Sequence, residues 1–339
     1  MHTDTVVAPP RSGLGRRVNA RLSGMRPGVR LAVVAAVVVA LVAVYLCTDI
    51  PGSFDYALKV RGRTVLAMLA VAAAIGASTV VFQTITANRI LTPGIMGFDA
   101  LYLLIQTIVV FAFGALTLAT ADPTLMWLIE IVAMTGFAVV LFRWLFAGRR
   151  RSIHLMLLVG IVFGVFFRSV TEWLQRMIDP AEFAVLQDAF FASFTRPDPQ
   201  LLTFSLIVIG AALAALVPLH DRLDVLTLGA PAAIGLGLRH RATVSVLFAI
   251  VAVMVAASTA LVGPTLFLGL IAANLAYALS GSFRHRHTLP MAALVGFACL
   301  VGGQLVLERV FALQTTLSVV IEFAGGILFL FLVLRKGAR

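Results

Sequence analysis

Ten long apolar blocks recur along almost the whole chain, separated by short polar segments. The core of a bilayer requires about 20 apolar residues for each spanning helix, and a backbone surrounded by lipid must satisfy its own hydrogen bonds, which favours helices. Because 61% of the 339 residues are hydrophobic and 12% are charged, a soluble globule is excluded. The sequence therefore predicts an all-α integral membrane protein with about ten transmembrane helices. The expected spans are 31–47, 64–82, 97–118, 125–146, 153–170, 201–217, 242–262, 265–279, 289–306 and 317–334.

Positive charge orients these spans. Placing the N-terminus in the cytoplasm puts most of the 26 Lys and Arg residues in cytoplasmic loops, as the positive-inside rule requires. With an even number of spans, both termini are then cytoplasmic. Residues 1–30 form a basic N-terminal arm, and residues 31–339 form the transmembrane domain. The net charge of +11 thus reports topology, and we expect no nucleic-acid partner.

Two loops are longer than a simple connection requires. The extracytoplasmic loop, 171–200, mixes acidic residues with phenylalanines, which indicates an amphipathic surface element or an interfacial cap. The cytoplasmic loop, 218–241, contains an apolar stretch followed by Gly229 and Pro231. A helix stop at glycine and a restart with proline in the first turn predict a short helix-turn-helix. Such an element would offer a docking surface to a cytoplasmic partner.

Close packing of one span is indicated by a GxxxG pattern. Gly160 and Gly164 lie one turn apart in the fifth expected span. Small residues at this spacing let another backbone approach the helix. We expect packing within the chain here in preference to a dimer contact.

The chain lacks the motifs of a nucleotide hydrolase. The phosphate-binding pattern GxxxxGK[ST] is absent, because neither Lys59 nor Lys336 follows a glycine. Any ATP would therefore be hydrolysed by another subunit. Cys47 and Cys299 both lie in apolar blocks and form no CxxC motif, so redox chemistry is not expected. A membrane enzyme would need polar residues clustered at one face, and the sequence offers none, which leaves translocation.

Four ionisable residues accompany the expected spans, namely Asp99, Glu130, Arg168 and Glu322. Ion-coupled transporters keep charges within the membrane for function. All four lie near the ends of expected spans, where snorkelling or an aqueous mouth can satisfy them, so we expect local structural roles. The alternative is an ion-coupled secondary transporter that works without an ATPase, with Asp99 and Glu322 as coupling carboxylates.

The segment 83–99 is polar and helix-breaking between two apolar spans, as a cytoplasmic turn should be. Its residues Gln83, Asn88, Pro93 and Gly97 resemble the signature of the FecCD-type permeases. These are the membrane subunits of ABC importers for ferric siderophores, haem and vitamin B12. The resemblance covers residues from about 31 to the C-terminus.

The chain also departs from that signature. Arg89 stands where the family has a proline, and Leu101 and Tyr102 replace a small Gly-Ala pair. These changes resemble the branch that imports iron siderophores through two different permeases, which favours a heterodimer and disfavours cobalamin.

The second half of the chain carries a further resemblance. Gly263, Phe267 and Gly269 are similar to the family's Gly-x-x-x-Phe-x-Gly-Leu segment. The family's Pro-His pair and the arginine after it are replaced by Ala273, Asn274 and Tyr277.

The resemblance implies a BtuC-like importer fold and a permease that carries no catalytic residue, metal or cofactor of its own. An iron–siderophore complex would cross the cytoplasmic membrane, driven by ATP with Mg on separate ABC ATPase subunits. The other expected partners are a second permease subunit, an extracytoplasmic siderophore-binding protein and the lipid bilayer.

The resemblance also implies three groups of site residues. The residues expected to contact the ATPase and couple it to transport are Leu223, Leu226, Leu228, Gly229, Ala232 and Gly235. The residues expected along the translocation path are Gln83, Asn88, Asp99, Tyr102 and Gln106. The residues expected to dock the binding protein are Lys59, Arg61, Arg63 and Arg309, for which snorkelling at the membrane interface is the alternative.

Overall fold

The computed structural model describes residues 25–48, 54–146, 153–195, 197–310 and 316–337. Among them, seven helices are long and apolar enough to cross a membrane, and three shorter apolar helices accompany them. Together they correspond to the ten blocks expected from the sequence. The long helices are α2 (Pro27–Cys47), α3 (Phe54–Thr86), α6 (Pro123–Phe146), α7 (Ile153–Gln175), α9 (Pro199–Leu216), α12 (His240–Val262) and α14 (His285–Arg309). The shorter apolar stretches are α4 (Phe98–Phe113), α13 (Leu268–Ser280) and Leu317–Phe331, the last within α15 (Leu317–Gly337).

A glycine with positive φ shortens one of the expected spans. The span expected over 97–118 ends at Gly114, whose φ is 82°, and the short helix α5 (Ala115–Thr120) follows it. Gly263, with a φ of 96°, ends α12, and the helix of the next expected span, 265–279, starts at Leu268. Glycine takes this conformation without the steric cost that a Cβ imposes. Residues 1–24 of the expected basic arm, 1–30, lie outside the described residues. The arm ends earlier than expected, because α2 already begins at Pro27.

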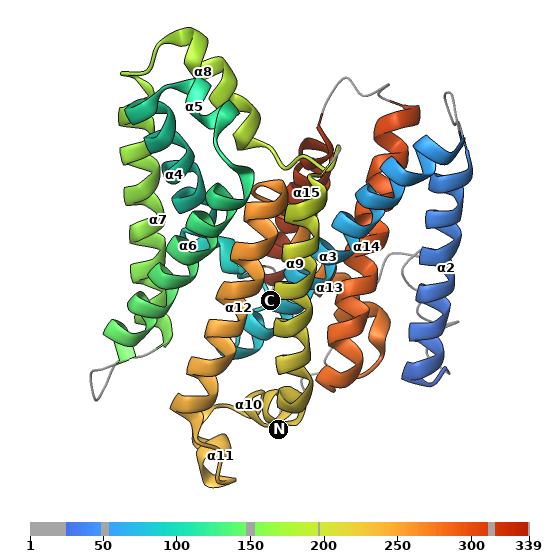
Figure 1. Ribbon diagram of the computed structural model, residues 1–339. Helices are drawn as coiled ribbons and strands as arrows, with labels where there is room; N and C mark the ends of the chain where they lie inside the picture. The colour runs from blue at the N-terminus through green and yellow to red at the C-terminus, as the bar shows by residue number, and fades with distance from the viewer. Residues whose placement is uncertain (1–24, 49–53, 147–152, 196, 311–315, 338–339) are drawn as a thin grey trace, which may run out of the picture.

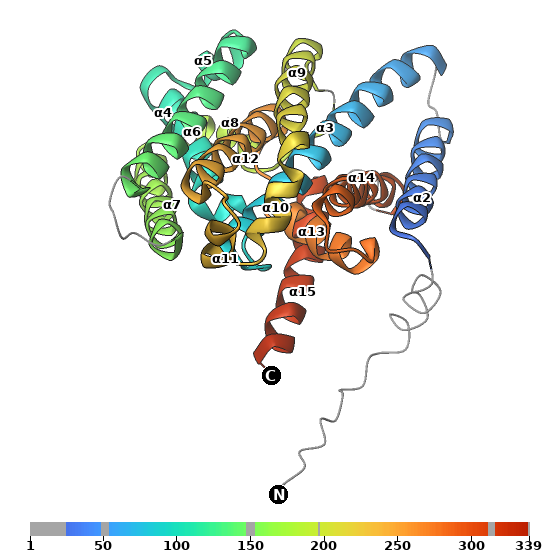
Figure 2. The ribbon, with the colours of Figure 1, turned by 90° about the horizontal axis from the view of Figure 1, so that it is seen from below.

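Helix α3 starts at the edge of the bundle, near α2, and runs into its centre (Figures 1 and 2). It packs against α9, α12, α13 and α14, and most of its membrane-crossing stretch is buried. Small residues make this possible. At Gly76 an added Cβ would lie 2.8 Å from the carbonyl oxygen of Ala292 in α14, so only glycine permits this approach of the two backbones.

The two ends of the bundle carry different short elements. At one end lie α8 (Pro180–Gln187) and the 3₁₀ turn η2 (Asp188–Phe190), both within the long loop 171–200 (Figure 1). At the other end, where α2 begins, lie the 3₁₀ turn η3 (Val217–Leu219), α10 (His220–Leu226) and α11 (Ala230–Gly235). The positive-inside assignment makes this second end the cytoplasmic one.

The GxxxG pattern packs within the chain. A Cβ on Gly164 would lie 3.2 Å from Cα of Gly97, which follows the 3₁₀ turn η1 (Pro93–Met96). A Cβ on Gly160 would lie 3.1 Å from the side chain of Met96. Gly97 itself has a φ of 91° and starts α4. The prediction of packing within the chain is therefore confirmed.

Candidate functional site

Helices α10 and α11 form a compact pair at the cytoplasmic end. Gly229 separates them with a φ of 89°, and its backbone N–H donates to the carbonyl of Leu226 at 3.1 Å. Pro231 follows in the first turn of α11, where its missing N–H needs no partner. The segment expected to form a helix-turn-helix thus has that shape, and glycine is the residue type that allows the turn.

The apolar side chains of this pair divide between two faces. Leu223, Leu226 and Ala233 are buried within the chain. Leu228, Ile234 and Leu236 are each about 60% exposed or more at the cytoplasmic end. Gly229, Ala232 and Gly235 are exposed as well. Neighbouring exposed apolar side chains in a water-facing element are typical of a protein contact surface.

This distribution corrects part of the sequence-based assignment. Leu223 and Leu226 are both expected to couple to an ATPase, but they are 0% and 7% exposed and pack inside this chain. The large exposed apolar side chains of the pair that the sequence interpretation omits are Ile234 and Leu236.

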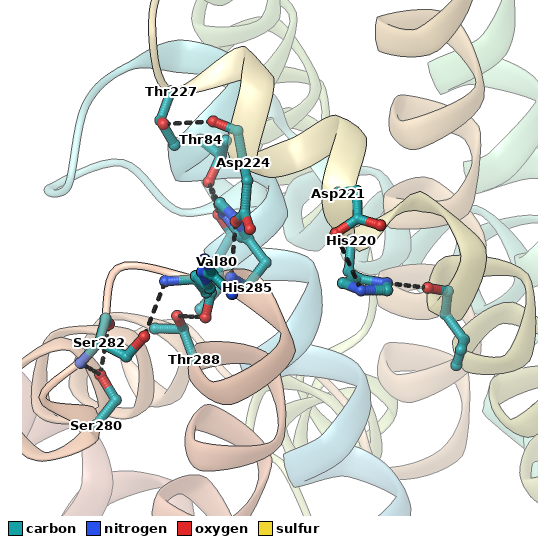
Figure 3. A network of polar contacts seen from close by, with 12 residues as sticks. Val80, Thr84, His220, Asp221, Asp224, Thr227, Ser280, Ser282, His285 and Thr288 are labelled. Carbon is teal, nitrogen blue, oxygen red and sulfur yellow. Dashed lines mark hydrogen bonds and ion pairs between the residues drawn. The ribbon is translucent and has the colours of Figure 1, made fainter. Parts of the chain in front are cut away.

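A chain of hydrogen bonds joins α10 to the core (Figure 3). One oxygen of Asp224 accepts from the backbone nitrogen of His285 at 2.8 Å and lies 2.6 Å from its ring Nδ1. Nε2 of the same ring lies 2.8 Å from Oγ1 of Thr84 in α3. His285 is buried, whereas 28% of the Asp224 side chain remains exposed. The exposed helix pair is thereby connected to two central helices, α14 and α3.

The two segments that resemble the family signature meet around one carbonyl. Nε2 of Gln83 donates to the carbonyl of Arg89 at 2.8 Å, and Nδ2 of Asn274 donates to the same oxygen at 3.2 Å. The guanidinium of Arg89 lies 4.7 Å from the ring centroid of Tyr277, in a cation–π contact. The departures from the family pattern at Arg89, Asn274 and Tyr277 are therefore spatial neighbours. Asn88, also assigned to the path, instead stabilises its own turn by accepting from the backbone N–H of Ile90.

Asp99 lines a cavity of about 580 Å³ between η1, α4, α7, α13 and α15. Its polar wall includes Arg168 and Glu172 from α7, and its apolar wall includes Phe267 and Phe329. Charges of both signs facing one space in a membrane protein are typical of a solute path.

Tyr102 and Gln106 do not line this cavity. Nε2 of Gln106 donates at 2.6 Å to Glu130 of α6, and both residues are buried. Glu130 is 3% exposed, so the expectation that snorkelling or an aqueous mouth satisfies it is wrong. A buried amide from the neighbouring helix partners it instead. The structure thus separates the predicted path residues into distinct places.

The four candidate docking cations also differ from one another. Lys59 and Arg63 are exposed near the outer start of α3. Arg61 turns inward, donating to the carbonyls of Tyr45 at 2.7 Å and Thr48 at 2.6 Å and pairing with Glu308 at 3.6 Å. Arg309 donates to Oγ1 of Thr48. Arg61 and Arg309 therefore hold α2, α3 and α14 together at the outer end.

The sequence interpretation omits the Asp224–His285 link because the two residues are far apart along the chain. A histidine following Arg284 has no neighbouring carboxylate in sequence and is typical of a solvated loop. Within the described part of the chain, no group of three or more His, Cys, Asp or Glu residues is placed to hold a metal ion.

Comparison with known proteins agrees with this architecture. The model of the FecCD transport family matches residues 31–335. The petrobactin import system permease protein YclO of Bacillus subtilis is 39% identical over 92% of this chain and 99% of its own length. FatC, a petrobactin import permease of Bacillus anthracis, is 37% identical over 84% of this chain and 81% of its own. A solved metal-chelate type ABC transporter in an inward-facing conformation superposes with a TM-score of 0.80, at 21% identity, over 91% of this chain and 99% of the other.

Proposed function

Because this chain belongs to the FecCD transport family, we propose that it is the permease subunit of an ABC importer and carries an iron–siderophore complex across the cytoplasmic membrane. The observation that carries the proposal is the family match over residues 31–335, which spans all ten apolar helices. The likeness to the metal-chelate transporter supports the fold.

Petrobactin is the first substrate to test. Two relatives above 35% identity, one of them matched over almost its whole length, are named as petrobactin import permeases. The Asp99 cavity supports passage of a polar chelate, because Asp99, Arg168 and Glu172 offer both signs of charge without a cluster that would strip the metal.

The energy source in this proposal lies outside the chain. Two ABC ATPase subunits would bind ATP and Mg, and this chain would contribute no catalytic residue and bind no cofactor. The exposed side chains of Leu228, Ile234 and Leu236 support docking of such a subunit at the α10–α11 pair. A movement of that pair would reach α14 and α3 through Asp224 and His285.

The remaining partners complete the importer. A second permease subunit, expected to be a different chain, would supply the other wall of the pathway. An extracytoplasmic siderophore-binding protein would deliver the chelate to the outer end, where Lys59 and Arg63 are exposed. Like charges on a soluble partner would be repelled there, so we expect acidic groups on its docking face.

The test is reconstitution of the assembled complex in liposomes with the binding protein outside. We expect uptake of ⁵⁵Fe-petrobactin when ATP is enclosed, and none with a non-hydrolysable ATP analogue. Uptake by this chain alone under an ion gradient, without ATP, would contradict the proposal and favour the ion-coupled alternative. ATP-dependent uptake of another ferric siderophore but not petrobactin would retain the importer and reject the substrate.

A further inference from the structure

A groove of about 430 Å³ opens between α9 and α14 near their cytoplasmic ends. Both helices pack against α3, which forms its floor. The floor is hollow because α3 presents Ala73 and Ala77, whose side chains are short, and Ala293 of α14 adds another small residue. The walls are aliphatic, from Leu213, Leu216, Val217, Leu289 and Pro290.

The groove is polar only at its cytoplasmic end, where His220, His285 and Arg286 line it. Nearby carboxylates already engage both histidines, since Asp221 lies 3.2 Å from His220 and Asp224 bonds His285. Arg286 is exposed, and the described residues give it no carboxylate partner. The cation available to a ligand is therefore Arg286, which lies one helical turn before Leu289 and Pro290 of the groove wall.

An apolar groove with a cation at its cytoplasmic end matches one molecule that surrounds such a protein. A phospholipid places its acyl chains in the hydrocarbon region and its phosphate at the level where Arg and Lys snorkel. A soluble anion could pair with Arg286 but would make no favourable contact with the aliphatic walls. An apolar helix of another protein could pack against the walls but would leave Arg286 without a counter-charge. We propose that this groove binds a phospholipid with an anionic headgroup from the cytoplasmic leaflet, with Arg286 contacting the phosphate.

Native mass spectrometry of the full-length chain tests this proposal, with phosphatidylglycerol and phosphatidylcholine of identical acyl chains as probes. The wild type should retain phosphatidylglycerol in preference to phosphatidylcholine. Arg286→Ala should weaken phosphatidylglycerol retention about fivefold, the effect expected from one cation at a membrane surface. Arg284→Ala is the matched control, because it removes the same charge two residues away and outside the groove.

A second variant separates the groove from the charge. Ala293→Phe should fill the groove and lower retention of both lipids, while thermal unfolding in detergent reports whether the protein still folds. Equal retention of the two headgroups by the wild type, or equal losses in the Arg286 and Arg284 variants, would overturn the proposal. Displacement of the lipid by millimolar inorganic phosphate would also overturn it, because the site would then be a simple anion site.

Discussion

Asp224 in α10 accepts two hydrogen bonds from His285 at the start of α14, one from its backbone nitrogen at 2.8 Å and one from its ring Nδ1 at 2.6 Å. The first N–H groups of a helix lack partners within that helix. A side chain from a different helix satisfies one of them here and also holds the ring. The cytoplasmic helix pair is thus bonded to the first residue of α14.

Removing this acceptor should uncouple the transporter. In Asp224→Ala the backbone N–H and ring Nδ1 of the buried His285 lose their shared acceptor, while Nε2 keeps Thr84. Leaving a buried donor unpaired costs about 1–3 kcal/mol. We expect iron uptake per ATP hydrolysed to fall about fivefold or more, while the ATPase still co-purifies. Asp221→Ala is the control, because it removes the same charge from the same helix at an 85% exposed side chain. Parallel losses of uptake and hydrolysis in the reconstituted complex would argue against a transmitting role.

The turn at Gly229 should be sensitive to a single methyl group. Nothing but Pro231 comes within 4.0 Å of a Cβ added at Gly229, so the cost of Gly229→Ala arises from its backbone conformation. A φ of 89° with a ψ of 159° is essentially restricted to glycine, and the cost amounts to about 1–3 kcal/mol. We expect less ATPase to co-purify from solubilised membranes. Gly210→Ala in α9, also in open space but in ordinary helix, should leave co-purification unchanged or improve stability. If the two variants recover the same amount of ATPase, the α10–α11 pair is not the docking element. Gly229→Asp, which adds a charge as well, should abolish co-purification.

The contact of α7 with η1 should tolerate no added atom. A Cβ at Gly164 lies 3.2 Å from Cα of Gly97, a backbone atom that cannot move aside cheaply. Gly164→Ala should destabilise the protein by about 1–3 kcal/mol, as overpacking does. Gly136→Ala in α6, where no atom lies within 4 Å, supplies the comparison. Thermal unfolding in detergent measures both, and an unchanged midpoint for Gly164→Ala would show that the two segments are not in close contact.

The outer cations should separate into two classes. Arg61→Ala removes bonds to Tyr45, Thr48 and Glu308 and should lower the thermal midpoint. Arg63→Ala removes an exposed charge and should leave the midpoint unchanged while weakening association with the binding protein. Surface-plasmon resonance at two salt concentrations measures that association, since a charge contact at the rim weakens with salt. If Arg63→Ala binds as the wild type does, the docking assignment of this residue fails.

The departures from the family pattern illustrate what sequence reasoning could not see. In the sequence, Arg89 and Tyr277 are two separate departures from the family signature. In the fold their side chains contact each other, and Asn274 donates to the Arg89 carbonyl. The replaced positions are therefore neighbours in the fold, which a linear comparison of positions does not reveal.

The predicted translocation path shows the same limit. Asp99, Tyr102 and Gln106 follow one another closely in α4, yet Asp99 faces the large cavity and Gln106 faces Glu130 of α6. Residues three or four apart share a helix face, but Asp99 and Gln106 differ in the neighbouring helix that they meet. The helical periodicity of the sequence predicts which side chains share a face of α4, but only the packing of the helices determines which neighbour each side chain contacts.

The sequence by itself determined the ten apolar helices, their expected orientation and the helix-turn-helix around Gly229, because these depend on local hydropathy, charge and backbone freedom. The tertiary structure decided which of the polar residues meet. The bond between Asp224 and His285 joins residues 61 positions apart, and the bond from Gln106 to the buried Glu130 spans 24. Arg61 turns inward to Tyr45 and Thr48, which lie 16 and 13 positions away. Such contacts arise from helix packing, where a buried polar group must find a partner in whichever element lies against it.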